Sequence, residues 1–161
     1  MNVQPGEIRQ HLARVLDDEA RQLAELEQLL IRETVVVNGD DAAAIERIGD
    51  VRRSCLDRLT KLDAERQAPG RMLSFGSGRE GFGRVLEWCD SGQTLRQRWE
   101  QNLQLARRCK DLNDRNGAVV ALKLSQVRQA LATLRGGGTQ PVYGRQGGTV
   151  AKFARRELGQ A

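Results

Sequence analysis

The sequence has 161 residues, the length of one domain or of one domain with a tail, which leaves little room for a multi-domain enzyme. Aromatic residues make up 4% and charged residues 29%, a profile that favours helices joined along narrow apolar seams over an aromatic-rich β-sandwich. The formal net charge is +5, but the basic residues are mostly scattered, so basicity alone does not identify a nucleic-acid-binding protein.

The first predicted helix runs from about Pro5 to Val37. Pro5 suits a first helical turn, and we expect Asn38-Gly39 to end the helix in the left-handed conformation. The β-branched run that begins at Thr34 could form a strand, but no alternating partner follows it, which favours a continuing helix. Apolar residues recur here in steps of three and four, on one helical stripe: Ile8, Leu12, Val15, Leu16, Leu23, Leu26, Leu30 and Val37.

The second predicted helix opens with Asp40 or Asp41 as its N-terminal cap and continues to about residue 66. Its apolar residues have helical spacing: Ile45, Ile48, Val51, Cys55, Leu59 and Leu62. Because only two or three residues join the two helices, we expect an antiparallel hairpin. At ~1.5 Å per residue each helix would be some 40 to 50 Å long, so the expected shape is a rod.

A break is expected over residues 67–77. Four helix-breaking residues in it or directly after it are expected to make a loop: Pro69, Gly70, Gly76 and Gly78. Its apolar residues could tuck under the bundle: Met72, Leu73 and Phe75. A short helix over residues 81–89 would then close one end of the bundle with its apolar surface: Phe82, Val85, Leu86 and Trp88.

The third long helix is predicted to begin near Ser91, where Asp90 and Gln93 resemble a capping box. Its stripe continues to residue 112 and resumes after the polar run 113–117: Leu95, Trp99, Leu103, Ala106, Cys109, Leu112, then Val120, Leu124, Val127, Leu131 and Leu134. The helical phase is kept across Asn116-Gly117, with Asn113 and Asn116 on the apolar seam. We therefore favour one helix of more than 40 residues over two helices joined by a turn.

These elements predict an all-α protein: an elongated antiparallel helical bundle or coiled coil of about three long helices plus one short helix, with a flexible C-terminal tail. Residues 1–135 form the predicted bundle domain, and 136–161 a Gly-rich tail that begins with three glycines. The tail contains the only Tyr, Tyr143, and a short amphipathic stretch over residues 150–158 that could order on a partner. Charge is polarised, with a net −4 over residues 1–67 and +9 over residues 68–161.

Catalytic and metal-binding chemistry is not expected. With His11 as the only histidine, no Ser-His-Asp triad or His-based metal site can be assembled within one chain. Cys55, Cys89 and Cys109 form no Cys-x-x-Cys pair and are expected to be reduced, small and buried. We therefore predict no enzyme activity and no cofactor. The absence of an 18-residue apolar run and of a signal-like N-terminus favours a cytoplasmic protein.

The third helix carries the candidate site. Asn113 and Asn116 are costly if buried without partners, so they must pair, contact water at a groove, or specify helix register. If this helix is longer than the hairpin, its C-terminal part would expose the apolar stripe that runs from Leu124 to Leu134. Such a stripe suits a partner helix or self-association.

At these residues the sequence resembles the FlgN family of flagellar type III export chaperones. The resemblance rests on Asn113-Asp114-Arg115-Asn116-Gly117, the apolar stripe after it, and a tail with Tyr143-Gly144-x-x-Gly147. It implies a cytosolic, non-catalytic chaperone that binds the disordered C-terminal segments of hook–filament junction proteins, prevents their premature association and delivers them to the export gate. It also implies a set of partner-binding residues: Asn113, Asn116, Gly117, Val120, Leu124, Val127, Leu131, Leu134, Tyr143 and Gly144.

Two alternatives stay open on the residues alone. A basic coiled-coil protein could bind nucleic acid through its positive half, although the cations of the third helix are dispersed and no aromatic platform lies among them. A helical scaffold could instead self-associate through the exposed stripe. No small-molecule substrate is expected in any of these cases.

Overall fold

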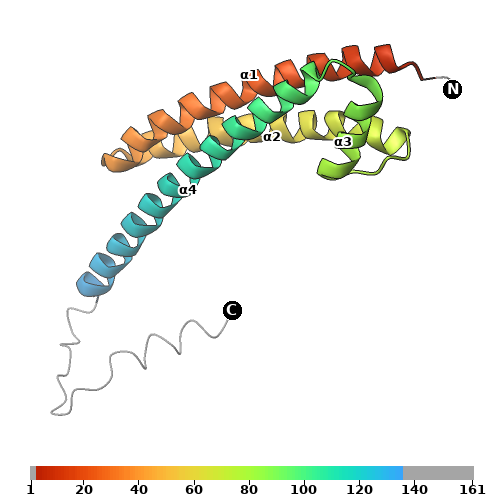
Figure 1. Ribbon diagram of the computed structural model, residues 1–161. Helices are drawn as coiled ribbons and strands as arrows, with labels where there is room; N and C mark the ends of the chain where they lie inside the picture. The colour runs from red at the N-terminus through yellow and green to blue at the C-terminus, as the bar shows by residue number, and fades with distance from the viewer. Residues whose placement is uncertain (1–2, 136–161) are drawn as a thin grey trace, which may run out of the picture. The chain divides into compact units, whose positions relative to one another are not determined.

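The computed structural model describes residues 3–135, which form four α-helices and no strand (Figure 1). The helices are α1 (Pro5–Asn38), α2 (Ala42–Met72), α3 (Gly78–Cys89) and α4 (Thr94–Arg135). The chain divides into two compact units, Met1–Ala121 and Leu122–Ala161. The all-α prediction, with three long helices and one short one, is confirmed. The expected tail over 136–161 lies outside the described residues.

Helix α1 forms the centre of the first unit. All eight residues of its predicted stripe are buried, and Leu29 and Glu33 are buried as well. The run from Thr34 to Val37 is helical, as predicted. Pro5 stands in the first turn, where its missing N–H leaves no hydrogen bond unmade.

The turn between α1 and α2 differs from the expectation in one respect. Gly39 ends α1 in an extended conformation (φ −86°, ψ −175°), so the predicted left-handed end is wrong. The carbonyl groups of the last turn find donors without it: the Asn38 side-chain amide donates to the Thr34 carbonyl (2.6 Å) and the Gly39 N–H to the Val36 carbonyl (3.1 Å). Asp41 caps α2 as expected, because its Oδ1 accepts a hydrogen bond from the Ala44 N–H (3.0 Å).

Helix α2 runs antiparallel to α1 and completes the predicted hairpin (Figure 1). Of its predicted apolar stripe only Cys55 is fully buried, and Val51 is 54% exposed. Ile48 and Leu59 are partly buried against a core cluster that also holds Leu26 and Cys109. The predicted stripe therefore has the correct helical phase, but part of it is exposed to solvent.

The predicted break at residue 67 is wrong, because α2 continues through Pro69 to Met72. Proline removes one backbone donor from a helix. Pro69 and Gly70 are nevertheless buried, and the Arg71 guanidinium donates to the Ala64 carbonyl (3.1 Å), which supplies a donor close to the lost one. Packing therefore holds the helix together across a residue that usually ends it.

A tight turn joins α2 to α3 and depends on glycine. Gly76 has φ +95°, and a Cβ on Gly70 or on Gly81 would lie 2.6 or 2.4 Å from the Gly76 carbonyl oxygen. Of the apolar residues in this region, Leu73 and Phe75 pack against the core as expected. Met72 does not, being 54% exposed.

Helix α3 closes one end of the first unit, as predicted. Phe82, Val85 and Leu86 are buried among residues of α1 and α4, and the Phe82 ring meets the Trp99 ring edge to face, with centroids 4.9 Å apart. The α3–α4 end is therefore the most densely apolar part of the first unit.

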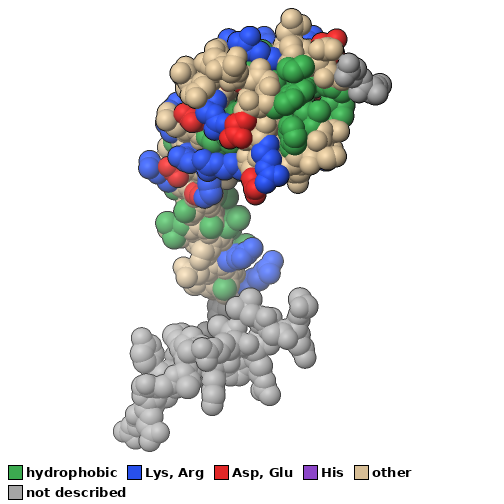
Figure 2. Space-filling view, turned by 45° about the vertical axis from the view of Figure 1, so that its right-hand side comes forward, with side chains coloured by type: hydrophobic (Ala, Val, Ile, Leu, Met, Phe, Trp, Pro, Cys, Tyr) green, Lys and Arg blue, Asp and Glu red, His purple; other side chains and the backbone are tan. Residues whose placement is uncertain are grey.

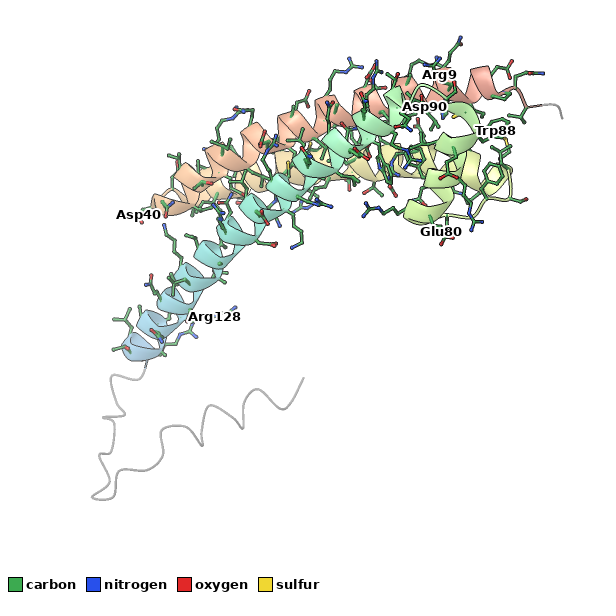
Figure 3. The ribbon with its side chains drawn as sticks, viewed as in Figure 1. Arg9, Asp40, Glu80, Trp88, Asp90 and Arg128 are labelled. Atoms are coloured by element: carbon green, nitrogen blue, oxygen red, sulfur yellow. The ribbon has the colours of Figure 1, made fainter. Side chains whose placement is uncertain are left out.

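Helix α4 begins at Thr94 rather than near Ser91, and the predicted capping box is wrong because Gln93 lies outside the helix with φ 55°. Asp90, which is labelled in Figure 3, still caps the helix although it lies four residues before Thr94. Its Oδ2 accepts hydrogen bonds from the N–H groups of Leu95 (2.8 Å) and Arg96 (3.1 Å). The helix is continuous through Asn116-Gly117, which confirms the prediction of a single helix of more than 40 residues.

Candidate functional site

A ladder of hydrogen bonds fixes α4 to α1 inside the first unit. Side chains of α4 donate to α1 carbonyl groups at three levels: Asn102 to Leu16 (3.0 Å), Cys109 to Leu23 (3.5 Å) and Asn116 to Leu30 (2.9 Å). The sequence offset is 86 residues at each level, so the two helices run parallel, and successive levels lie seven residues apart. The ladder sets the register of α4 on α1.

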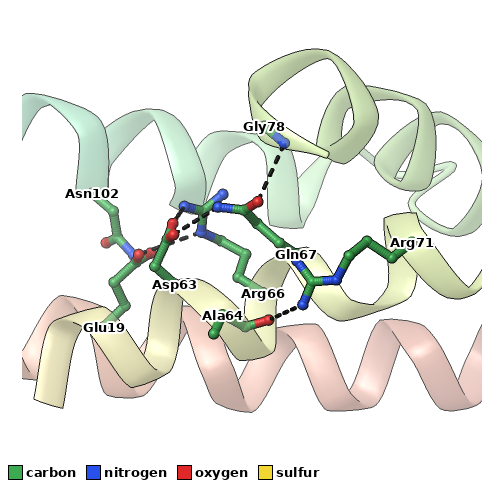
Figure 4. A network of polar contacts seen from close by, with 8 residues as sticks. All are labelled: Glu19, Asp63, Ala64, Arg66, Gln67, Arg71, Gly78 and Asn102. Carbon is green, nitrogen blue, oxygen red and sulfur yellow. Dashed lines mark hydrogen bonds and ion pairs between the residues drawn. The ribbon is translucent and has the colours of Figure 1, made fainter. Parts of the chain in front are cut away.

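Two of the three levels also contain a polar triad with one residue from each long helix, in which the asparagine is buried and the arginine is partly buried. In the first triad Glu19 Oε2 accepts from Asn102 Nδ2 (3.1 Å), and Glu19 Oε1 pairs with Arg66 Nε of α2 (3.4 Å) (Figure 4). In the second triad Glu33 Oε2 accepts from Asn116 Nδ2 (2.9 Å), and Glu33 Oε1 pairs with Arg52 Nη1 (2.7 Å).

The two triads repeat the same pattern fourteen residues apart in each of the three long helices: 19 and 33, 52 and 66, 102 and 116. A shift of α4 by one turn would leave a buried carboxylate beside an apolar side chain, which is expensive. The triads therefore specify which residues of the three helices lie together. Asn116 has a further bond, because the Thr34 hydroxyl donates to its Oδ1 (2.9 Å).

The level between the triads is apolar and contains two thiols. Cys109 and Cys55 are buried in one cluster and, like Cys89, are free thiols, as predicted. Burial raises the pKa of Cys109 to about 11, and the nearby Glu27 carboxylate adds to the rise. Burial also raises the pKa of Cys55. Both groups stay protonated at neutral pH and behave as small core residues.

Of the two asparagines predicted on the seam, the structure buries only Asn116, which is 2% exposed. Asn113 is exposed, so its predicted place on the packed seam is wrong. The reason is an open groove between α2 and α4, named here the α2–α4 groove. Two adjoining hollows of about 380 and 250 Å³ form it. Its apolar lining is shared by three helices: Leu23, Leu26, Leu30, Leu56, Leu59, Leu103, Ala106 and Cys109.

Gly117 and Val120 follow Asn116, the last α4 residue of the hydrogen-bond ladder. Gly117 is exposed and helical, and an added Cβ there would meet no atom within 4 Å. Val120 is half-buried. Nothing inside the first unit requires glycine at position 117.

The predicted apolar stripe of the second unit consists of Leu124, Val127, Leu131 and Leu134, and is called the apolar stripe below. These side chains are 51%, 55%, 45% and 79% exposed. Tyr143 and Gly144 lie outside the described residues.

Sequence analysis missed Asn102 and the four charged members of the triads. Glu33 interrupts the apolar stripe of α1 at a position that the helical phase places inside, and Glu19 does the same fourteen residues earlier. A search for polar residues on apolar seams at matched spacing would have found both triads.

Within the described part of the chain, no group of three His, Cys, Asp or Glu side chains is placed to hold a metal ion. No helix in that part is long and apolar enough to cross a membrane. The apolar stripe remains the candidate site that the sequence predicts.

Comparison with known families gives one finding for the whole chain. The family model described as FlgN protein matches residues 1–151. Comparison with the curated proteins and with the solved structures finds no match. The family match includes all four helices and the apolar stripe. The chain therefore belongs to the FlgN family of flagellar export chaperones.

Proposed function

We propose that this chaperone binds the C-terminal segments of hook–filament junction proteins in the cytoplasm, keeps them from associating early, and delivers them to the flagellar export gate. The observation that carries the proposal is the apolar stripe, which is exposed in a member of a chaperone family. Tyr143 and Gly144 remain predicted contacts to substrate or gate.

The stripe has the composition and spacing of one half of a helix–helix interface. Its steps of three and four residues present one face for an amphipathic segment that becomes helical on binding. Completing the burial of the four stripe side chains, which are 45 to 79% exposed, contributes about 1 kcal/mol each, before the cost of ordering the partner. The sum suits reversible capture of a cargo that has to be released later.

The test is a pair of substitutions in the stripe. Leu124→Asp and Val127→Asp put a carboxylate on the proposed interface, and we expect each to weaken binding of the junction-protein C-terminal segments by at least about 30-fold. Isothermal titration calorimetry of the full chain measures this, with circular dichroism to show that the helices persist.

The first unit supplies matched controls. Leu56 in the α2–α4 groove is 43% exposed and Val51 of α2 is 54% exposed. These exposed fractions are similar to those of Leu124 and Val127. Leu56→Asp and Val51→Asp should leave binding within about twofold of the unmodified chain. If they weaken it as much as the stripe variants do, the proposed site is wrong; if no segment binds the unmodified chain, the proposed cargo is wrong.

A further inference from the structure

The chain after Asn113-Asp114 has an unusual run of charge. Between Asp114 and Glu157 there is no acidic residue, while eight basic residues occur: Arg115, Lys123, Arg128, Arg135, Arg145, Lys152, Arg155 and Arg156. The apolar stripe falls inside this run, so any partner on the stripe meets a surface of one sign.

Within the described helix, two of these cations flank the stripe on one side. Arg128 lies one turn after Leu124 and Arg135 one turn after Leu131, so each arginine is a surface neighbour of a stripe leucine. Both arginines are exposed (Figure 3 labels Arg128). In Figure 2 the stretch of helix that precedes the grey residues carries green and blue side chains and no red ones.

Several cations of the first-unit part of α4 form ion pairs. Arg98 pairs with Asp17 (2.9 Å), Arg108 with Glu27 (2.8 Å) and Lys110 with Asp114 (2.7 Å). Among residues 3–135, Arg128 and Arg135 have no acidic partner. Arg107 and Arg115 of the first unit also lack an ion pair among these residues, but they precede the stripe, whereas Arg128 and Arg135 flank its exposed apolar face.

We propose that the apolar stripe recognises an amphipathic helix whose apolar face is flanked by Asp or Glu on the side that meets Arg128 and Arg135. This inference rests on the proposed function and names the chemistry of the segment that the chaperone binds. Complementary charge fixes the direction and register of a helix that apolar contacts alone would hold in several ways.

The same charges argue against other occupants. A second copy of the chain would bring cations against cations across a shared stripe. Nucleic acid would use the arginines but leave the leucines exposed, and residues 122–135 offer no aromatic side chain for base stacking. That stretch also lacks the Trp or Phe typical of helices that lie in a membrane surface.

The experiment uses the full chain and two synthetic helical peptides of about 18 residues, or five turns. They share one Leu-rich face; one peptide has Glu at the flanking positions and the other Lys. We expect the Glu peptide to bind about 10-fold or more tightly than the Lys peptide at low salt, and the difference to shrink at high salt, because exposed ion pairs are screened. Fluorescence anisotropy measures both affinities.

The Arg128→Glu/Arg135→Glu double variant should lose or reverse the preference. Arg107→Glu/Arg115→Glu is the matched control, since both residues are exposed arginines of α4 in the first unit, and it should keep the preference. Equal binding of the two peptides by the unmodified chain overturns the inference. So does tighter binding of duplex DNA or of phosphatidylglycerol vesicles than of the Glu peptide.

The junction-protein segments are titrated in the same assay, which separates the two claims. If they bind in a way that Leu124→Asp abolishes but the Arg128→Glu/Arg135→Glu variant does not weaken, the chaperone function holds and the charge inference fails. If they do not bind while the Glu peptide does, through the stripe and the two arginines, the charge inference holds and the proposed cargo is wrong.

Discussion

At the scale of single residues, Asn113 and Asn116 lie one turn apart in α4 but have different environments. Asn116 bonds to a carbonyl, a hydroxyl and a carboxylate of α1, whereas Asn113 lines the open α2–α4 groove. Two similar residues in one motif therefore have separate roles. Asn116 holds the fold together, and Asn113 remains available at the surface.

The difference predicts unequal costs of substitution. Asn116→Ala leaves Glu33 buried with Arg52 as its remaining partner, and should lower the free energy of unfolding by about 2 to 4 kcal/mol. Asn113→Ala should change it by less than about 0.5 kcal/mol. Urea unfolding followed by circular dichroism measures both changes. Similar losses of unfolding free energy would contradict the assignment of Asn116 as the buried residue that joins α4 to α1.

For single residues, the sequence did not show which residues of the other helices each side chain contacts. The helical phase placed both asparagines on the seam, which is right for Asn116 and wrong for Asn113, because it could not show that a groove opens between α2 and α4 at Asn113. Nor could it show that Glu33 is buried and Glu19 partly buried, because each carboxylate pairs with an arginine 19 or 47 residues away in the chain. The periodicity of one helix shows which face a residue lies on, but it does not identify the residues of other helices that contact it.

At the scale of elements, the long helices were predictable where periodicity was strong and less so where a breaker was present. Continuity of α4 through Asn116-Gly117 followed from the kept phase, and the structure confirms it. The break predicted at Pro69 is wrong, because the α2–α3 turn packs against α2 there and keeps it helical. The left-handed end predicted at Gly39 is also wrong, because side-chain and backbone donors complete the last turn of α1 without it.

Gly117 gives an element-scale prediction. In a helix interior with open space around it, Gly117→Ala should raise the free energy of unfolding by about 1 kcal/mol. Gly49→Ala is the control, since Gly49 lies inside α2 and also has no atom within 4 Å of an added Cβ. Thermal unfolding should show both gains.

Binding then separates the two glycines. If a partner approaches the backbone at Gly117, only Gly117→Ala weakens capture of the junction-protein segments. Unchanged binding by both variants would mean that position 117 serves no contact.

At the scale of the whole molecule, the buried thiols influence how stability depends on pH. The Cys109 thiol has a pKa of about 11 in the folded chain, against an ordinary value of 9.0, because burial disfavours the thiolate. Unfolded thiols ionise above pH 9 while this buried thiol stays neutral until about pH 11. The folded state therefore loses stability as the pH rises through that interval, and is unaffected by this group below it.

The loss attributable to Cys109 should reach about 2 to 3 kcal/mol by pH 11. Cys109→Ala removes the ionisation, so the fall of its unfolding free energy between pH 8.5 and 11 should be shallower by about that amount, whatever its starting stability. Urea titrations across this range measure the two slopes, and parallel curves would contradict the raised pKa.

The 86-residue offset between α1 and α4 also bears on how chains of this kind can change in length. Inside the first unit an extra turn in one long helix moves a carboxylate away from its arginine and asparagine, so insertions survive there when all three helices gain residues together, in sevens. Beyond residue 121 no triad imposes that coupling. Whole heptads gained or lost in that part of α4 would keep the phase of the apolar stripe and would need no matching change in α1 or α2.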